Sequence, residues 1–153
     1  MLHLLGEVQP SAVSAMAYTG IGEPLKLEAT YDVEEHSTVF VKFREDLAVT
    51  FETAWASNIT SCQETIILGA KGGLRLDPFT YYAEEDDRGI ATCVELPREP
   101  MKEWKGLIQD FVSACLENRK PRTPGEDGMK TMQIIDMAYQ SSKLNREVRL
   151  EEL

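Results

Sequence analysis

The sequence lacks the glycine-rich signatures by which many nucleotide-binding domains hold phosphate groups. A dinucleotide site needs Gly-x-Gly-x-x-Gly between a strand and a helix, and other nucleotide sites need a Walker loop; neither motif is present. Gly20 and Gly22 are followed by Leu25 where the third glycine should stand, and the glycines at 69–73 lead toward a strand. We therefore interpret both groups as turns and expect no cofactor-binding residue in this chain.

Metal-binding and disulfide-forming residues are also scarce. His3 and His36 lie far apart in the sequence and neither is close to a cysteine, so we expect no metal site. The chain has 3 cysteines, an odd number without a C-x-x-C spacing, which indicates reduced thiols. Because reduced thiols are typical of proteins inside the cell, we expect a cytoplasmic location. The cysteines are Cys62, Cys93 and Cys115.

Long apolar runs and an excess of positive charge are both absent. No run approaches the ~20 apolar residues that a membrane-spanning helix needs. Acidic residues outnumber basic residues by 26 to 16, and the formal net charge of -10 repels nucleic-acid phosphates and anionic lipids. We therefore expect neither a nucleic-acid partner nor a membrane partner.

The first two thirds of the chain carry strand patterns. Alternation of side chains predicts a strand over about 10–21. The runs 37–43 and 47–55, separated by charged residues, predict a hairpin. Two further strand pairs are expected around the glycines at 69–73 and around the acidic residues at 84–88. Together these patterns predict about six or seven strands in a mostly antiparallel order.

Helix patterns follow the strands. Apolar residues recur at steps of three and four between about 100 and 117, which predicts an amphipathic helix. Thr123 and Glu126 are spaced as a capping box with Pro124 in the first helical position, which predicts a second helix that ends near Asn145. A short alternating segment then predicts a final strand.

The opening leucines followed by Gly6 indicate the end of a helix. A helix of ~5 residues does not offset its nucleation cost, so we expect that its beginning is missing and that the chain is a truncated piece. The alternative is a short, frayed N-terminal turn packed on the core. Of its 153 residues 42% are hydrophobic and 27% are charged, which is typical of one domain with one core. The expected domain, 1–153, comprises the helix end at 1–6, a sheet over 10–97, two helices over 100–145 and a final strand at 147–150.

Strands first and helices last predict an α+β fold, with an open, mostly antiparallel sheet and helices packed on one face. The run 47–55 alternates, so that its even-numbered residues, among them Ala48 and Thr50, share one face. Both faces of the central strands hold apolar or small residues, and an uncovered face would leave a large apolar patch. We therefore expect the chain to pair with itself, as a homodimer or higher oligomer, through the face opposite the helices.

Aromatic and hydrogen-bonding residues gather where the chain enters the central hairpin. An aromatic ring beside short polar groups suits the recognition of a polyol, and loops on a rigid sheet commonly carry binding residues. The alternative interpretations are that the acids only keep the loop in water, that the histidine is a surface residue and that the tryptophan belongs to the core. The predicted substrate-proximal residues are Tyr31, Asp32, Glu34, His36 and Trp55.

The order of six segments resembles the C-terminal domain of the glucose–fructose oxidoreductase, inositol dehydrogenase and rhizopine-catabolism (Gfo/Idh/MocA) family. No single segment is diagnostic, but their order and spacing are specific, and they cover nearly the whole chain. The segments are LLGEV at 4–8, DVEE at 32–35, LGAKGGLRL at 68–76, GEDG at 125–128, AYQSS at 138–142 and EVRL at 147–150.

The resemblance implies a fold like the C-terminal domain of glyceraldehyde-3-phosphate dehydrogenase, without a Rossmann domain in this chain. It also implies that the full-length protein binds NAD or NADP through an N-terminal Rossmann domain and oxidises or reduces a sugar, polyol or related hydroxy compound. The family's catalytic lysine and its Asp/His motif would both precede Met1, and His3 lies too close to Gly6 to be that histidine. No catalytic residue is therefore assigned in this chain, which is expected to be inactive alone. The alternative is a stand-alone, non-catalytic binding or assembly module that reuses the sheet.

Overall fold

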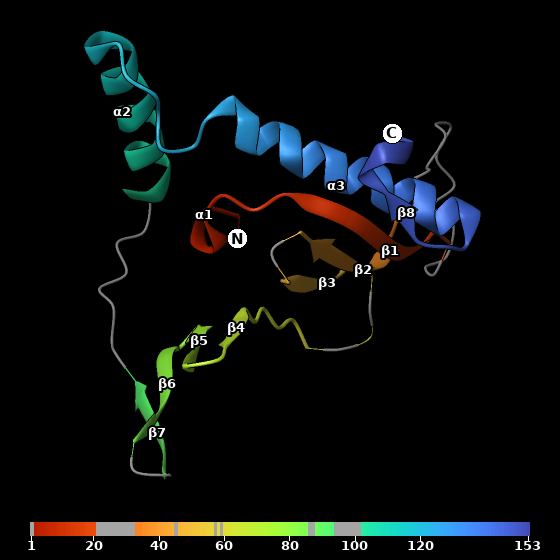
Figure 1. Ribbon diagram of the computed structural model, residues 1–153, viewed down its shortest axis with the longest axis horizontal. Coiled ribbons are helices and arrows are strands. Elements are labelled where there is room, and N and C mark those ends of the chain that lie inside the picture. Colours follow the sequence, from red (N-terminus) through yellow and green to blue (C-terminus); the bar gives the residue numbers. More distant parts are fainter. Residues whose placement is uncertain are drawn as a thin grey trace. The chain divides into compact units, whose positions relative to one another are not determined.

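The computed structural model describes residues 2–20, 33–44, 46–56, 58, 60–85, 88–93 and 102–153 (Figure 1). Two of the predicted substrate-proximal residues, Tyr31 and Asp32, lie outside these residues. The contacts divide the chain into two compact units. The first unit comprises Met1–Asn58 and Ser113–Leu153, and the second unit comprises Ile59–Val112. The expected single domain over 1–153 remains a prediction.

The first unit is built on a four-stranded antiparallel sheet with the order β3-β2-β1-β8. The helix α1 (Leu2–Leu5) precedes this sheet, and Gly6 follows it in the left-handed conformation with φ 80, which confirms the predicted helix end. The helix α3 (Gly125–Leu144) packs along β1 (Figure 1). The strands are β1 (Pro10–Tyr18), β2 (His36–Phe43), β3 (Ala48–Ala54) and β8 (Val148–Arg149), and the short helix η1 (Leu150–Glu152) follows.

The core of the first unit lies between this sheet and α3. Val13 stands opposite both Val41 and Val148 in the ladder, and all three side chains are fully buried together with Met137 of α3. Their side of the sheet is named here the helix face, and Val49 belongs to it because it pairs with Val41. The burial of aliphatic side chains against one helix therefore stabilises this unit.

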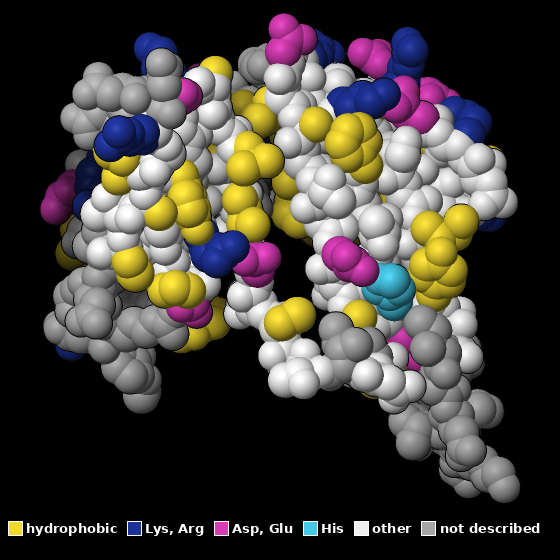
Figure 2. All heavy atoms as spheres, turned by 90° about the horizontal axis from the view of Figure 1, so that it is seen from below, with side chains coloured by type: hydrophobic (Ala, Val, Ile, Leu, Met, Phe, Trp, Pro, Cys, Tyr) yellow, Lys and Arg dark blue, Asp and Glu magenta, His cyan; other side chains and the backbone are white. Residues whose placement is uncertain are grey.

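The opposite side of the sheet is named here the open face. Ala48 and Thr50 lie on this face and are exposed, which confirms the predicted alternation in 47–55. Phe40, which pairs with Thr50, is 39% exposed. Figure 2 views the molecule from below and shows a histidine side chain (cyan) with acidic (magenta) and hydrophobic (yellow) side chains beside it.

Two serines of α3 accept hydrogen bonds from β1 beyond the residues that pair with β8. The strand β8 pairs only with Ala12 and Val13 of β1. Farther along β1, the N–H of Ala15 donates to Oγ of Ser141 and the N–H of Ala17 donates to Oγ of Ser142, each at 2.9 Å. Ser141 Oγ also donates to the carbonyl oxygen of Arg146 at 2.6 Å. The serines of the AYQSS segment therefore satisfy backbone groups at the edge of β1 that would otherwise lack partners within the protein.

The beginning of α3 differs from the prediction. The helix starts at Gly125, and Pro124 is the N-cap without a side-chain cap hydrogen bond, so the predicted capping box is wrong. Thr123 lies before the N-cap and is therefore not in register to cap the helix. Glu126 instead pairs with Lys120 at 3.1 Å. A hydrogen bond from its own backbone N–H, and then Lys120, hold the pKa of Glu126 below its usual value.

The second unit contains another four-stranded antiparallel sheet, with the order β4-β5-β6-β7. The glycines at 69–73 connect β4 to β5, which confirms the predicted tight turn. A Cβ at Gly72 would lie 2.5 Å from the carbonyl oxygen of Tyr82, so only glycine fits this close approach. The strands are β4 (Ile66–Gly69), β5 (Gly72–Leu76), β6 (Phe79–Glu85) and β7 (Arg88–Cys93).

The two sheets and their helices confirm the α+β class, although the sequence had suggested one sheet. The described residues between Ala54 and Ile66 form no strand, so the hydrogen-bonded ladder stops after β3. The helix α2 (Lys102–Glu117) confirms the first predicted helix. Among the described residues, no helix is long and apolar enough to cross a membrane.

Candidate functional site

The segment before β2 is fixed by backbone hydrogen bonds on both sides. The N–H of Glu35 donates to the carbonyl oxygen of Tyr18 at 2.8 Å, and the N–H of Trp55 donates to the carbonyl oxygen of Glu35 at 3.1 Å. Glu35 thus extends the ladder between the ends of β1 and β3, and it is buried, with 6% exposed. This end of the sheet therefore holds the neighbouring Glu34 in one position.

Glu34 is held by two side chains from distant parts of the first unit. The hydroxyl of Tyr139, on α3, donates to Glu34 Oε2 at 2.8 Å. The indole Nε1 of Trp55, just after β3, donates to the Glu34 carbonyl oxygen at 2.9 Å. One bond orients the carboxylate and the other fixes the backbone, so two side chains from distant parts of the chain determine the position of the charge.

Glu34 and Tyr139 line a hollow between the helix face and α3, named here the α3 hollow. Its volume is about 280 Å³. The hydroxyl-bearing residues Ser37 and Thr53 line it together with Glu34, and small aliphatic side chains such as Val39 complete the wall. A few polar groups in a mostly apolar concave surface are typical of small-molecule sites.

The α3 hollow continues beneath the first half of α3. A larger trough of about 760 Å³ shares Ser37, Val39 and Thr53 with the hollow and extends to Pro124 at the N-terminus of the helix. Phe51 lines the trough and is 36% exposed. The two cavities therefore adjoin each other within the first unit, and they are together named here the recess.

His36 lies on the other side of the sheet from the α3 hollow. It pairs with Tyr18 and Ala54 in the ladder, and its ring stacks on that of Tyr18 with 5.5 Å between centroids and 15° between planes. Its Nε2 lies 3.2 Å from Oε1 of Glu52. The structure therefore separates two predicted site residues, with Glu34 lining the recess and His36 on the open face.

Trp55 is not a core residue. Its side chain is 62% exposed, and its indole N–H makes the hydrogen bond to Glu34. The structure thus brings Trp55 and Glu34 together. Nothing in their local sequence indicated Tyr139, Ser37 or Thr53, because these residues approach Glu34 only through the packing of α3 on the sheet.

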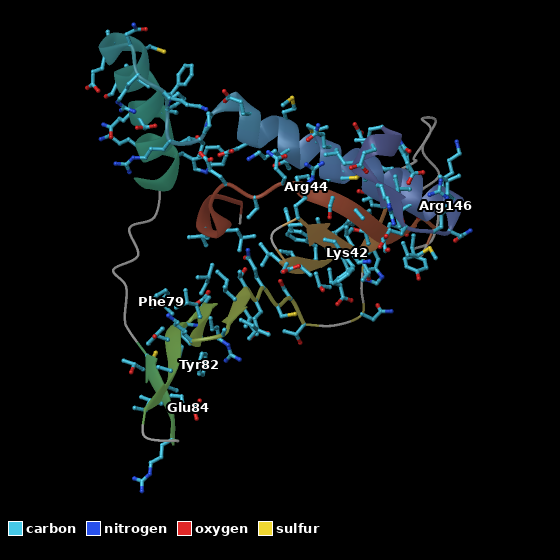
Figure 3. The ribbon with its side chains drawn as sticks, in the orientation of Figure 1. Lys42, Arg44, Phe79, Tyr82, Glu84 and Arg146 are labelled. Carbon is cyan, nitrogen blue, oxygen red and sulfur yellow. The ribbon has the colours of Figure 1, made fainter. Side chains whose placement is uncertain are left out.

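The second unit carries a separate hollow of about 810 Å³ beside Gly73. Tyr82 and Glu84 project from β6 beside it (Figure 3). The Arg75 guanidinium in its lining is engaged with Glu64, with Nε 3.1 Å from Oε1. The glycines here join two antiparallel strands, whereas a dinucleotide pyrophosphate needs a glycine turn that leads into a helix N-terminus. These residues do not fit a nicotinamide cofactor.

Comparison with known proteins agrees with this architecture. A family model described as the oxidoreductase family, C-terminal alpha/beta domain (Gfo/Idh/MocA), matches residues 1–150. D-xylose 1-dehydrogenase (NADP+) of Haloarcula marismortui is 28% identical over 90 residues, which cover 56% of this chain and 24% of that protein.

Solved structures resemble the chain over most of its length. Aldose-aldose oxidoreductase from Caulobacter crescentus, complexed with glycerol, has a TM-score of 0.70 at 20% identity and covers 93% of this chain and 42% of its own. Levoglucosan dehydrogenase in complex with NADH and L-sorbose has a TM-score of 0.73 at 19% identity, covering 93% and 45%. The chain thus spans less than half of the length of each of these proteins.

Proposed function

The chain belongs to the Gfo/Idh/MocA oxidoreductase family as its C-terminal α/β domain, and we propose that it supplies the substrate-binding and oligomerisation part of an NAD(P)-dependent enzyme that acts on a sugar, polyol or related hydroxy compound. The observation that carries this proposal is the carboxylate of Glu34 in the lining of the α3 hollow, which accepts from the Tyr139 hydroxyl while Trp55 holds the Glu34 carbonyl oxygen. A fixed carboxylate is a strong acceptor for the hydroxyl groups of such a compound.

The rest of the α3 hollow supports the same class of ligand. The hydroxyls of Ser37 and Thr53 can both donate and accept hydrogen bonds, which suits a molecule whose own hydroxyls do the same. The volume of about 280 Å³ is close to the lower limit of roughly 300 Å³ for small-molecule sites. A small polyol is therefore the ligand that this hollow fits best.

The proposed cofactor is NAD or NADP, bound outside this chain. One relative is named a dehydrogenase with NADP+ and another is described in complex with NADH. We assign the cofactor to an N-terminal nucleotide-binding domain of the full-length protein, because the glycine turn of this chain leads from strand to strand. On this proposal the chain alone does not transfer hydride.

Ligand binding can be followed through the tryptophan that holds Glu34. The chain has 2 tryptophans, so Trp104→Phe leaves Trp55 as the sole indole. Titration with D-xylose or L-sorbose should change its emission in a saturable way, because the ligand contacts the segment that Trp55 holds. Thr53→Val should weaken this binding, whereas Thr38→Val, which changes the same residue type on the open face, should not.

Two results would contradict the proposed site. The first is an emission that does not respond to either sugar at concentrations up to hundreds of millimolar. The second is an equal loss of affinity in Thr38→Val and Thr53→Val, which would mean that the response does not come from the α3 hollow.

Self-association is the second part of the proposal. The open face carries the exposed residues Phe40, Ala48 and Thr50. Light scattering at tens of micromolar should report at least a dimer, and Ala48→Glu should dissociate it by placing a charge in the interface. Gln109→Glu, on the exposed surface of α2, is the control that should leave the mass unchanged. A wild-type chain that is monomeric at this concentration would contradict the proposed role in oligomerisation.

A further inference from the structure

We propose that the α3 hollow selects uncharged or amino-substituted sugars and polyols and rejects carboxylates and phosphates. Glu34 is the specificity-determining charge, and Tyr139 is the positioning residue that holds it. This inference rests on the proposed function, and it narrows the class of substrate that the site accepts.

The first support is the charge of the recess lining. Among the described residues that line the α3 hollow, Glu34 is the sole charged side chain. In the adjoining trough the sole charged side chain of the described lining is Asp127. Neither lining contains a lysine or an arginine, so the charge that the described part of this mostly apolar recess presents is negative. An anionic ligand would meet repulsion here without a compensating cation.

The second support is that Glu34 is held both at its carboxylate and at its backbone. The Tyr139 hydroxyl engages Oε2 at 2.8 Å, while the Trp55 indole holds the Glu34 carbonyl oxygen at 2.9 Å. Moving the carboxylate away from an anionic ligand would break the first bond. A carboxylate accepts about four hydrogen bonds, so Glu34 retains the capacity to accept from a ligand hydroxyl or ammonium.

The expected discrimination follows from the distance between like charges. A ligand carboxylate bound in the hollow would lie within roughly 6 Å of Glu34, and repulsion in protein surroundings would then weaken binding at least about tenfold. A ligand ammonium at the same place would be attracted. A hydroxyl would donate a charge-assisted hydrogen bond at little desolvation cost.

The test uses four ligands with one carbon skeleton: D-glucose, D-glucosamine, D-gluconate and D-glucose 6-phosphate. Their dissociation constants for the chain are measured by ligand-observed NMR at constant ionic strength. D-glucosamine and D-glucose should bind at least about tenfold more tightly than the two anions. Binding of either anion within about threefold of D-glucose would overturn the inference.

Matched variants assign the selectivity to Glu34. Glu34→Gln keeps an acceptor for Tyr139 but removes the charge, so the ratio of the gluconate to the glucosamine dissociation constants should fall about tenfold. Glu52→Gln, an equivalent change on the open face, should leave this ratio unchanged. An unchanged ratio in Glu34→Gln would overturn the inference.

Tyr139→Phe tests the positioning role, since it removes the hydroxyl but keeps the ring. The ratio of the two dissociation constants should fall, because a carboxylate that is no longer held can turn away from an anion. A purely structural role for Tyr139 would weaken all four ligands equally and leave the ratio intact, which would contradict the positioning role. If none of the four ligands binds, the proposed function fails as well; binding without discrimination overturns only the inference.

Discussion

The two sheets have the same number of strands and the same antiparallel pairing, but they differ in burial. The sheet of the first unit buries Val13, Val41 and Val148 against Met137 of α3. Among the described residues of the second unit, the buried position is Thr80, a polar residue. Four paired strands alone do not make a hydrophobic core, since a sheet needs a covering layer before its apolar face is removed from water.

Covering by α3 also completes the hydrogen bonding of the first sheet. Ser141 and Ser142 accept from the amides of Ala15 and Ala17, and the same helix carries Tyr139 to Glu34. The helix that forms the core therefore also forms the candidate site. Substitutions that disturb the packing of α3 should lower both the stability of the first unit and its affinity for the ligand. Substitutions in the second sheet should change neither of these.

The largest effect is expected in the core of the first unit. Met137→Ala removes a side chain with 0% exposure and should lower the free energy of unfolding by about 2–5 kcal/mol, because a cavity remains. Met132→Ala is the control on the same helix, since Met132 is 55% exposed, and it should change stability by no more than about 0.5 kcal/mol. Urea denaturation measures both, and equal effects would mean that Met137 is not part of a core.

A smaller loss is expected when the serine link is broken. Ser141→Ala leaves the Ala15 N–H and the Arg146 carbonyl without this partner at a position 1% exposed, and it should cost about 1–3 kcal/mol. Ser11 donates to the Lys42 carbonyl oxygen at an exposed position, so Ser11→Ala should cost less than about 0.5 kcal/mol. A neutral Ser141→Ala in the same denaturation experiment would show that β1 does not need this link.

Two glycine substitutions test whether the stability of the second unit is independent of that of the first. In Gly72→Ala the new Cβ would meet the Tyr82 carbonyl oxygen at 2.5 Å, which should loosen the pairing of β5 and β6 at a cost of roughly 1–2 kcal/mol. A Cβ added to Gly128, on α3, would meet no other atom within 4 Å, so Gly128→Ala should stabilise by up to about 1 kcal/mol. Amide hydrogen exchange should place the first effect in β5 and β6 alone, and faster exchange in β1 or β2 would contradict this separation.

The smallest effect is expected at the exposed C-terminal ion pair. The guanidinium of Arg146 (labelled in Figure 3) bonds Glu152 Oε2 at 2.7 Å, and the Arg149 N–H donates to Oε1 at 2.8 Å. First Arg146 and then this N–H lower the pKa of Glu152 from 4.5 to about 2. Since the pKa of Glu152 is lower in the folded chain than in the unfolded chain, its interactions stabilise the fold above pH 4.5. This stabilisation is lost as the pH falls toward 2.

The corresponding measurement compares melting temperatures at several pH values. Glu152→Gln should melt slightly below the wild type at pH 7, and the difference should shrink as the pH falls below about 4.5. A difference that grows on acidification would contradict the assigned direction of the pKa change.

Local patterns predicted the elements of this fold well, because they depend on neighbouring residues. The alternation along β3 predicted that Ala48 and Thr50 share one face, and the glycines at 69–73 predicted the turn between β4 and β5. The start of α3 was missed by one residue, because the prediction made Thr123 the N-cap, whereas Pro124 is the N-cap and has no side chain that can cap the helix. A helix boundary is not fixed by the sequence pattern to better than one or two residues.

The candidate site was predicted only in part. Two of the residues predicted from their place in a loop and at a strand end, Glu34 and Trp55, contact each other in the structure. Their contact with a substrate stays a prediction. Tyr139 was not found, since it stands 105 residues from Glu34 and meets it only after α3 packs on the sheet. The separation of His36 from Glu34 also follows from strand pairing, because His36 enters the ladder opposite Tyr18 while Glu34 precedes it.

The most direct test of the proposed site is a map of amide chemical shifts of the chain titrated with D-xylose. The perturbed amides should surround the α3 hollow in the first unit, at Ala15, Ser37, Thr53 and Tyr139. Perturbations around Gly73 beside the hollow of the second unit, or none at all, would contradict the claim that the helix-covered sheet holds the ligand.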